Sequence, residues 1–64
     1  MRVRFFQFDL TSQGRIGGNI LEGILRGFDG AFYHIEHEGR IHLRRLRDIV
    51  AEYRRKLPTE PYGE

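Results

Sequence analysis

The sequence predicts an all-β protein, a small five-stranded sheet bent strongly enough to close into a barrel. Three observations favour this fold. Apolar residues recur at period two near the start of the chain, as at Val3 and Phe5. Gly23 and Gly27 interrupt a later apolar segment, where glycine in a strand pattern indicates a bend, a bulge or a close backbone approach. Turn chemistry at Asp29-Gly30 then separates this segment from the next.

The first strand is expected over residues 2–10. Its apolar alternation changes phase between Phe5 and Phe6, which predicts a bulge or a strong bend there and turns one of the two rings away from the main core. Residues 11–18 are polar and rich in glycine, and we interpret them as a mobile hairpin loop. This loop lacks the Gly-Lys-Ser/Thr ending of a phosphate-binding loop. Arg15 is its candidate for a ligand contact.

The second strand is expected over residues 19–28. Its apolar residues come in adjacent pairs, Ile20-Leu21 and Ile24-Leu25, and not in strict alternation. That pattern suits a strongly bent strand shared between the two halves of a small barrel, with Gly23 at the bend.

The third and fourth strands are expected over residues 31–36 and 40–46, and the loop between them sets their register. A three-residue loop over 37–39 pairs Ile35 with Ile41 and gathers the apolar side chains on one face. A two-residue loop at Glu38-Gly39 would set Ile35 against His42 and mix the faces. Because register follows the hydrophobic pattern, we prefer the three-residue loop, with glycine in the left-handed position.

Two interpretations of residues 43–57 remain open on the residues alone. The first is a helix whose apolar stripe ends at Pro58. The second is a tight turn at 45–47 followed by a fifth strand over 48–53, which would close the barrel and leave no open sheet edge. Residues 58–64 are expected to form an extended or disordered tail beyond a single domain over 1–57.

The bulk composition limits the possible classes of protein. A chain of 64 residues buries only about 60% of its unfolded surface and is marginally stable alone, so oligomerisation or tight packing is expected to support it. The absence of cysteine excludes disulfides, thiolate metal sites and a cysteine nucleophile. The start of the chain is too charged for a signal peptide and no apolar run approaches the roughly 20 residues of a membrane span, so we expect a soluble cytoplasmic protein without membrane contact.

The charge is unevenly distributed along the chain. The net charge is +2, but residues 40–56 carry seven basic residues against two acidic ones. A basic third of a small domain is the electrostatic footprint of a protein that binds an anionic partner, with nucleic acid the first candidate. The plainer interpretation is a solvated surface rich in arginine.

Two segments carry a family resemblance. Residues 23–29, Gly-Ile-Leu-Arg-Gly-Phe-Asp, resemble the first motif of Sm-like (LSm/Hfq) proteins: a glycine, an apolar pair, a spacer and then Gly-Phe-Asp before an apolar strand. Residues 43–50 are more loosely similar to the second motif, where the fourth strand meets a tight turn and the fifth strand begins. The resemblance covers residues 19–53. It implies a five-stranded SH3-like/Sm-like barrel and favours a strand over 48–53.

The resemblance also implies a function. Sm-like barrels join fourth strand to fifth strand into homo-oligomeric rings of five to seven subunits, and the rings bind single-stranded RNA rich in uridine or adenosine. Asp29 occupies the family position near the base-binding pocket, and Arg44 and Arg45 occupy basic positions that contact base or phosphate. The chain departs from the family at Tyr33, where asparagine is usual, at Ala31, where an aromatic is common, and in lacking a helix before the first strand.

The residues themselves add further candidates for an RNA site. Phe32 and Tyr33 offer rings on which bases stack, and Arg26 and Arg47 add positive charge. The expected site therefore contains seven residues: Arg26, Asp29, Phe32, Tyr33, Arg44, Arg45 and Arg47.

Other chemistry is less well supported by the sequence. His34, His37 and His42 are the only ligand-like cluster, and the preferred register sets His34 opposite His42 on the outward face, which is too few ligands for a zinc site. Nothing supplies an activated nucleophile or an oxyanion site, so we expect no enzyme activity, no cofactor and no metal. Two further functions remain as alternatives, a protein-interaction module and a small basic barrel that binds duplex DNA.

Overall fold

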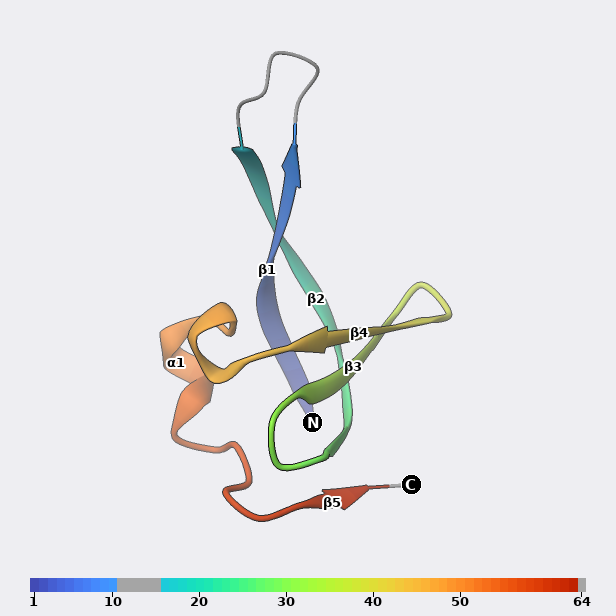
Figure 1. Ribbon diagram of the computed structural model, residues 1–64, viewed down its shortest axis with the longest axis vertical. Coiled ribbons are helices and arrows are strands. Elements are labelled where there is room, and N and C mark those ends of the chain that lie inside the picture. Colours follow the sequence, from blue (N-terminus) through green and yellow to red (C-terminus); the bar gives the residue numbers. More distant parts are fainter. Residues whose placement is uncertain (11–15, 64) are drawn as a thin grey trace.

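The computed structural model describes residues 1–10 and 16–63 and consists mostly of antiparallel β-structure (Figure 1). Four strands follow one another in the sheet in chain order, and a short fifth strand pairs with the second. Two short helical turns lie between the fourth and fifth strands. The elements are β1 (Arg2–Leu10), β2 (Ile16–Phe28), β3 (Tyr33–His37), β4 (Arg40–Arg44), the 3-10 helix η1 (Leu46–Asp48), α1 (Ala51–Arg54) and β5 (Tyr62–Gly63).

Strand β1 pairs with β2 in an unbroken register from Arg2 opposite Ile24 to the end of the strand. The bulge expected between Phe5 and Phe6 is therefore wrong. Ordinary alternation already separates the two rings, because successive side chains of a strand point to opposite faces. Phe5 is fully buried, whereas Phe6 is half-buried and stacks on Phe8 with ring centroids 6.1 Å apart.

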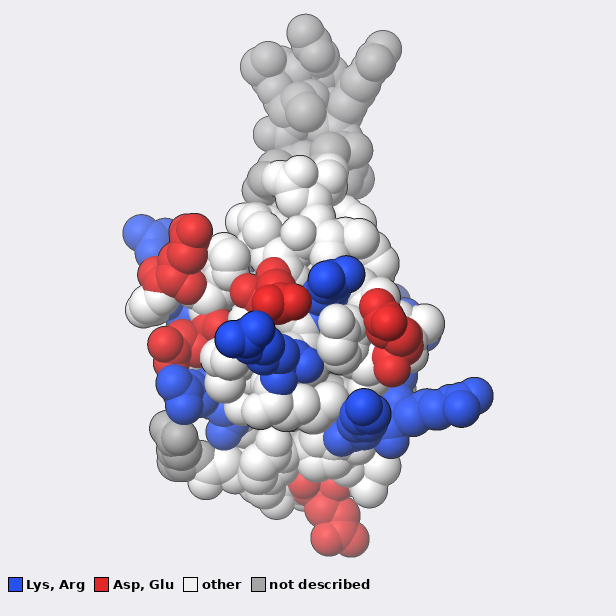
Figure 2. All heavy atoms as spheres, turned by 180° about the vertical axis from the view of Figure 1, so that it is seen from behind, with Lys and Arg blue, Asp and Glu red and all other residues white. Residues whose placement is uncertain are grey.

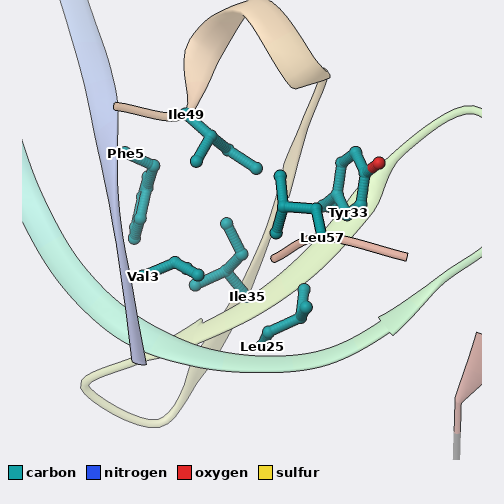
Figure 3. Packing of buried hydrophobic residues seen from close by; sticks show 7 residues of the cluster. All are labelled: Val3, Phe5, Leu25, Tyr33, Ile35, Ile49 and Leu57. Carbon is teal, nitrogen blue, oxygen red and sulfur yellow. The ribbon is translucent and has the colours of Figure 1, made fainter. Parts of the chain in front are cut away.

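Strand β2 is the long, curved strand beneath the core (Figure 3). Its pairing with β3 shifts between Leu25 and Gly27, so the irregularity of the sheet lies here and not in β1. Gly23 faces β3 so closely that an added Cβ would lie 2.7 Å from Cγ2 of Ile35 and would also clash with the carbonyl of Glu36. Of the three features that a glycine in a strand indicates, the structure shows a close backbone approach at Gly23, where only a residue without a side chain fits.

Both ends of the chain lie along one edge of β2. Strand β1 begins opposite Ile24, and the carbonyl of Met1 accepts a 2.8 Å hydrogen bond from the backbone N–H of Leu25. Farther along the same strand, β5 pairs Gly63 with Gly27 and Tyr62 with Phe28. The tail is therefore extended and covers the part of β2 that β1 does not reach.

The hairpin between β3 and β4 contradicts the preferred three-residue loop. Ile35 lies opposite His42, and the loop is the two-residue Glu38-Gly39. Both loop residues have positive φ, 51° and 77°, as a type I′ turn requires, and this turn matches the twist of the paired strands. Turn geometry thus overrides the hydrophobic pattern.

The consequence is an inversion of the two faces of β4. His42 points inward, where its ring lies 5.4 Å from the ring of Phe5. Ile41 and Leu43 point outward and remain 53% and 48% exposed. The inner face of β4 is therefore built from polar side chains, and its outer face is apolar.

The fifth strand expected over 48–53 is also wrong. After η1 the chain returns to β1 through a single bridge between Ile49 and Phe5, with the N–H of Val50 donating to the carbonyl of Arg4 at 2.9 Å. It then turns into α1, so the helix that the alternative placed over 43–57 is observed only as the short η1 and α1, separated by Ile49 and Val50. Because only one bridge forms, the sheet is not closed into a barrel.

The side chain of Arg54 explains why the chain leaves β1 so soon. Its guanidinium donates to the carbonyl of Ile49 at 2.8 Å and to the carbonyl of Arg47 at 3.1 Å. These carbonyls thereby gain partners without a ladder of strand hydrogen bonds. None of the helices in the described part of the chain is long and apolar enough to span a membrane.

The core lies between the curved sheet and the segment that follows β4 (Figure 3). Tyr33 is its only polar-tipped member, and its hydroxyl donates to the carbonyl of Pro58 at 2.8 Å. Strand β4 contributes no buried residue to this core. Within residues 1–10 and 16–63, the buried hydrophobic residues are Val3, Phe5, Leu25, Tyr33, Ile35, Ile49 and Leu57.

Candidate nucleic-acid interface

Asp29 organises the corner between β2 and β3. Its Oδ1 accepts hydrogen bonds from the backbone N–H of Ala31 at 2.8 Å and of Phe32 at 2.7 Å, which is the geometry of an Asx turn. Gly30 takes the positive φ that this turn needs, 101°. Asp29 therefore shapes the corner with one carboxylate oxygen, while the other oxygen faces His34.

The contact between Asp29 and His34 is short. Asp29 Oδ2 and His34 Nε2 lie 2.8 Å apart. This hydrogen bond, followed by those from the backbone N–H groups of Phe32 and Ala31, lowers the pKa of Asp29 from 3.8 to about 2. The carboxylate is thus anionic at any physiological pH, and the corner carries a fixed negative charge.

Phe32 and Arg45 meet next to this corner. The guanidinium carbon of Arg45 lies 5.3 Å from the centre of the Phe32 ring, within the range of a cation–π contact. Phe32 is half-buried and Arg45 is exposed. The backbone N–H of Arg45 donates to the carboxylate of Asp48 at 3.3 Å, which holds the start of η1. A ring and a guanidinium, both suited to stacking on a base, therefore lie together at the end of the sheet.

Tyr33 and Arg44 are taken up by the core instead. Tyr33 is 5% exposed, stacks on Phe28 with centroids 4.2 Å apart, and has its pKa raised by burial and then by Tyr62. Arg44 donates to the carbonyls of Phe6 at 3.0 Å and Leu43 at 2.8 Å and lies over the ring of Phe5. Both residues were predicted to take part in a base pocket. Tyr33 is buried and Arg44 is half-buried, so each exposes less of its side chain than Arg45 does.

The two remaining predicted residues lie on different surfaces. Arg47 follows Arg45 within η1 and is exposed. Arg26 lies on the outward face of β2, where its Nε and Nη2 are each 2.9 Å from Oε1 of Glu36. The structure thus brings Asp29, Phe32 and Arg45 together, with Arg47 close by along the chain. Arg26 lies away from Phe32 and Arg45, on a depression that Asp29 also lines. Arg15 and most of its loop lie outside the described residues.

An open depression of about 600 Å³ lies on the outward face near Arg26. Tyr62 and Pro61 of the tail form part of its wall. Sequence reasoning missed the tail, although Gly27 gave a signal: a Cβ there would lie 3.0 Å from Cα of Gly63, so glycine marks the approach of a second backbone. The other side chains lining the depression are Arg26, Phe28, Asp29, His34, Glu36 and Ile41.

The histidines are distributed over both faces of the sheet. The expected pairing of His34 with His42 is wrong, because the two-residue loop sets His34 opposite Leu43. His37 and His42 instead approach each other on the inner face, with ring centroids 5.8 Å apart, and burial and then Arg44 lower the pKa of His42. Over residues 1–10 and 16–63, no three histidine, aspartate or glutamate side chains are grouped to hold a metal ion.

Acidic and basic side chains are mixed on one face of the molecule. Figure 2 shows basic and acidic side chains interspersed over one face of the molecule. Arg4 and Glu22 form one pair at 3.5 Å, in addition to the pair of Arg26 with Glu36. Of the seven basic residues of 40–56, Arg40 and Arg44 belong to β4, and the other five lie between Arg45 and Lys56.

Comparisons with protein-family models, with curated proteins and with solved structures find no match.

Proposed function

We propose that the chain is an Sm-like single-stranded RNA-binding protein that acts as a homo-oligomeric ring and has no catalytic role. The observation that carries the proposal is the Phe32–Arg45 pair beside the Asp29 corner. Asp29 and Arg45 come from the two sequence segments that resemble the two Sm motifs, and Phe32 follows the first of these segments by three residues. Their proximity is what a shared binding site for RNA requires.

Binding at this pair follows from simple chemistry. A base stacks on the exposed side of Phe32 or on the guanidinium plane of Arg45, and each stacked base contributes about 1–3 kcal/mol. Arg47, exposed in η1, supplies a phosphate contact. Uridine- or adenosine-rich RNA is the expected ligand because the Sm-like family that the two motifs resemble binds such strands. Asp29 acts by holding the corner.

The open edge of β4 supports self-association. This strand is last in the sheet order, so one of its edges has no strand partner within residues 1–10 and 16–63. Ile41 and Leu43 are exposed beside that edge. Pairing with another copy would cover the edge and both side chains. Within one copy, the fifth strand of the barrel is represented only by the bridge between Ile49 and Phe5. In this proposal a neighbouring copy supplies the missing strand contacts.

Fluorescence anisotropy with labelled oligouridine and oligoadenosine tests the RNA site. The wild-type chain is expected to bind in the micromolar range, with affinity falling by at least about tenfold between 50 and 200 mM salt. Arg45→Ala is expected to weaken binding at least about fivefold, because it removes both a stacking surface and a charge. Phe32→Leu removes the ring but keeps an apolar side chain for the half-buried position.

Arg40→Ala is the matched control, because Arg40 is also exposed and basic but lies at the β3–β4 hairpin. It is expected to change binding only slightly. An equal loss from Arg40→Ala and Arg45→Ala would contradict a localised site and would leave only non-specific charge attraction. Tighter binding of duplex DNA than of either single strand would favour the alternative of a duplex-binding protein.

A protein-interaction module is the second candidate function. The exposed apolar side chains of Ile41, Leu43 and Leu46 favour it, because apolar residues gathered along an open strand edge are typical of a docking surface. A chain that is monomeric and has no affinity for RNA would support this function over the first.

A further inference from the structure

The outward face of β1 carries two aromatic rings that lie outside the buried core. Because Phe5 fills the core and successive side chains of a strand alternate, Phe6 and Phe8 both point to the opposite face. Their rings are nearly parallel, with 25° between the planes and 6.1 Å between the centroids. Phe8 is 61% exposed, more than any other large hydrophobic residue of 1–10 and 16–63. It lies on the part of β1 that extends with β2 beyond the other strands (Figure 1).

The ring of Phe8 rests on a glycine of the neighbouring strand. Gly18 lies opposite Phe8 in the β1–β2 pairing. A Cβ added to Gly18 would lie 3.4 Å from Cδ1 and 3.7 Å from Cε1 of Phe8, so the ring lies over this glycine. Backbone on one side and the ring of Phe6 on another hold Phe8 in place. A ring held in this way loses little freedom when a further flat group stacks on it.

A hollow of about 260 Å³ opens beside the two rings, between β1 and the end of β4. Its other walls come from Leu43, Arg44 and Asp48. The guanidinium of Arg44 is fixed there, because it donates to the carbonyls of Phe6 at 3.0 Å and Leu43 at 2.8 Å. Apolar surface with a few fixed polar groups is typical of a ligand site, and this hollow is small enough for a single planar base.

Two arginines continue the line of the rings along β1. Arg2 and Arg4 share the face and the period of two, and their side chains are 77% and 53% exposed. Both approach the carboxylate of Glu22, at 4.0 and 3.5 Å, so these three side chains together keep a net positive charge. Exposed ion pairs of this kind contribute little to stability, and a phosphate group can therefore replace Glu22 as the partner. We call the line of Arg2, Arg4, Phe6 and Phe8 the β1 stripe.

The composition of the β1 stripe favours a nucleic acid over a second protein as its occupant. Rings and basic side chains along one groove are the combination with which proteins bind single strands, since bases stack on the rings while phosphates meet the charges. The centre of a protein–protein interface is instead depleted of charged residues. An apolar partner seated on the rings would also meet Arg4, the neighbour of Phe6 on this face.

We propose that the β1 stripe binds single-stranded RNA, with bases stacked on Phe6 and Phe8, one of them in the hollow, and phosphates at Arg4 and Arg2. The proposal rests on the proposed function and adds a second surface to it. Asp48 connects the two surfaces, since it lines the hollow and its carboxylate accepts the backbone N–H of Arg45 at 3.3 Å. A strand that contacts the Phe32–Arg45 pair can therefore continue past η1 onto the β1 stripe.

Tryptophan fluorescence tests the stacking directly. The chain contains no tryptophan, so Phe8→Trp introduces a single reporter on the β1 stripe. Titration with an oligouridine of about ten nucleotides is expected to quench this reporter, because a base stacks on the indole. Tyr62→Trp is the control, since Tyr62 is also half exposed but pairs with Phe28, at the opposite end of β2 from Gly18. Unchanged emission of Phe8→Trp at saturating RNA would overturn the proposal.

Substitutions at Phe8 separate the ring from its apolar bulk. Phe8→Leu is expected to weaken oligouridine binding at least about fivefold, whereas Phe8→Tyr keeps the ring and the affinity. Ile20→Ser is the matched control, because Ile20 lies opposite Phe6 on the same face and is 58% exposed but has no ring. An equal loss in Phe8→Leu and Ile20→Ser would contradict base stacking, because it would show that apolar area alone decides binding.

Arg45→Ala in the Phe8→Trp background separates this proposal from the proposed function. It is expected to weaken binding while quenching at saturating RNA persists. RNA binding that depends on Arg45 without any quenching would refute the β1 stripe alone. Quenching with an affinity that Arg45→Ala leaves unchanged would refute the Phe32–Arg45 site alone. A blue shift of the reporter with rising protein concentration, in the absence of RNA, would overturn the proposal in favour of a second copy as the occupant.

Discussion

At the scale of single residues, the chain uses its most distinctive side chains to build turns and pack the core. Asp29 was expected to contact a ligand, yet both of its carboxylate oxygens have partners within the protein. Tyr33 was expected to stack on a base, yet its hydroxyl and its ring are both occupied by core contacts. Arg45, by contrast, keeps an exposed guanidinium over a ring.

Asp29 makes stability dependent on pH. Its folded-state pKa of about 2 lies below its ordinary value of 3.8, so its contribution is fully present above pH 3.8 and is lost as the pH falls through 2. Asp29→Ala is therefore expected to lower the melting temperature at pH 7, and the difference from wild type is expected to shrink towards pH 2. Thermal unfolding by circular dichroism at several pH values measures this. A difference between Asp29→Ala and wild type that stays the same from pH 7 to pH 2 would contradict this explanation.

Gly23 tests the close approach of β2 to β3. Gly23→Ala would place its Cβ against backbone atoms of Glu36, which cannot move aside as a flexible side chain can. We expect a loss of about 1–3 kcal/mol in the free energy of unfolding, as for other overpacked positions. Gly39→Asn is the control in open space, since no atom lies within 4 Å and asparagine tolerates a φ of 77°. Urea denaturation compares the two, and an equal loss in both would contradict the steric explanation.

At the scale of elements, the β3–β4 hairpin shows turn geometry overriding apolar patterning. The two-residue loop leaves Ile41 and Leu43 exposed and turns His42 inward. This arrangement is compensated by the contacts that Arg44 and His42 make with the ring of Phe5. An apolar outer face on the last strand of the sheet is the result.

The two-residue loop predicts a stabilising substitution. Glu38 has a φ of 51°, where asparagine is much better tolerated than glutamate, and Asn-Gly is the preferred type I′ pair. Glu38→Asn is expected to raise the free energy of unfolding by about 0.5–1 kcal/mol. Glu38→Ala removes the same charge without favouring positive φ and is expected to give no gain. A gain of the same size in both variants would contradict the turn assignment.

The segment between β4 and α1 depends on one arginine. Arg54→Ala would leave the carbonyls of Ile49 and Arg47 without their guanidinium donors, at a cost of about 1–3 kcal/mol. Arg54→Lys keeps the charge but cannot reproduce the fork, so it is expected to recover only part of the loss. Arg55→Ala, at the neighbouring exposed position, is the control and is expected to be near neutral. Chemical denaturation of the three variants gives the ranking.

At the scale of the whole molecule, the described part of the 64-residue chain has a core of seven buried hydrophobic residues. This is a small core for a domain of that length, and covering the apolar edge at Ile41 and Leu43 would add to it. We expect light scattering to give a mass of several copies and Leu43→Lys to lower it, because the charge would repel across a paired edge. Leu46→Lys, outside the strand, is the control. A strictly monomeric wild-type chain would contradict the ring.

Much of the fold was predictable because its signals are local. Glycine spacing marked the close approach at Gly23, and apolar runs marked the first four strands. The register of the β3–β4 hairpin was not predictable from polarity, because Phe5 offers a surface on which His42 and Arg44 pack as well as apolar side chains would.

The parts that were missed depend on contacts distant in the sequence. Phe32 and Arg45 were each predicted to belong to the site, but their contact was not, because the two residues lie in separate segments of the sequence. Arg54 donates to the carbonyls of Ile49 and Arg47, which would otherwise need partners in a strand. No local sequence pattern identifies these contacts. Tyr62 lies beside the depression because the tail pairs with β2. Gly27 was the only residue in the sequence that indicated this pairing.

The meeting of both chain ends on one edge of β2 bears on how the chain can be rearranged. Met1 contacts Leu25 and Gly63 pairs with Gly27, only two positions farther along the same strand. A short glycine linker could therefore join the ends, and the chain could be reopened between Glu38 and Gly39 as a circular permutant. In that permutant the alignment of β3 with β4 would depend on the packing of His42 and Arg44 against Phe5, without a turn to impose it.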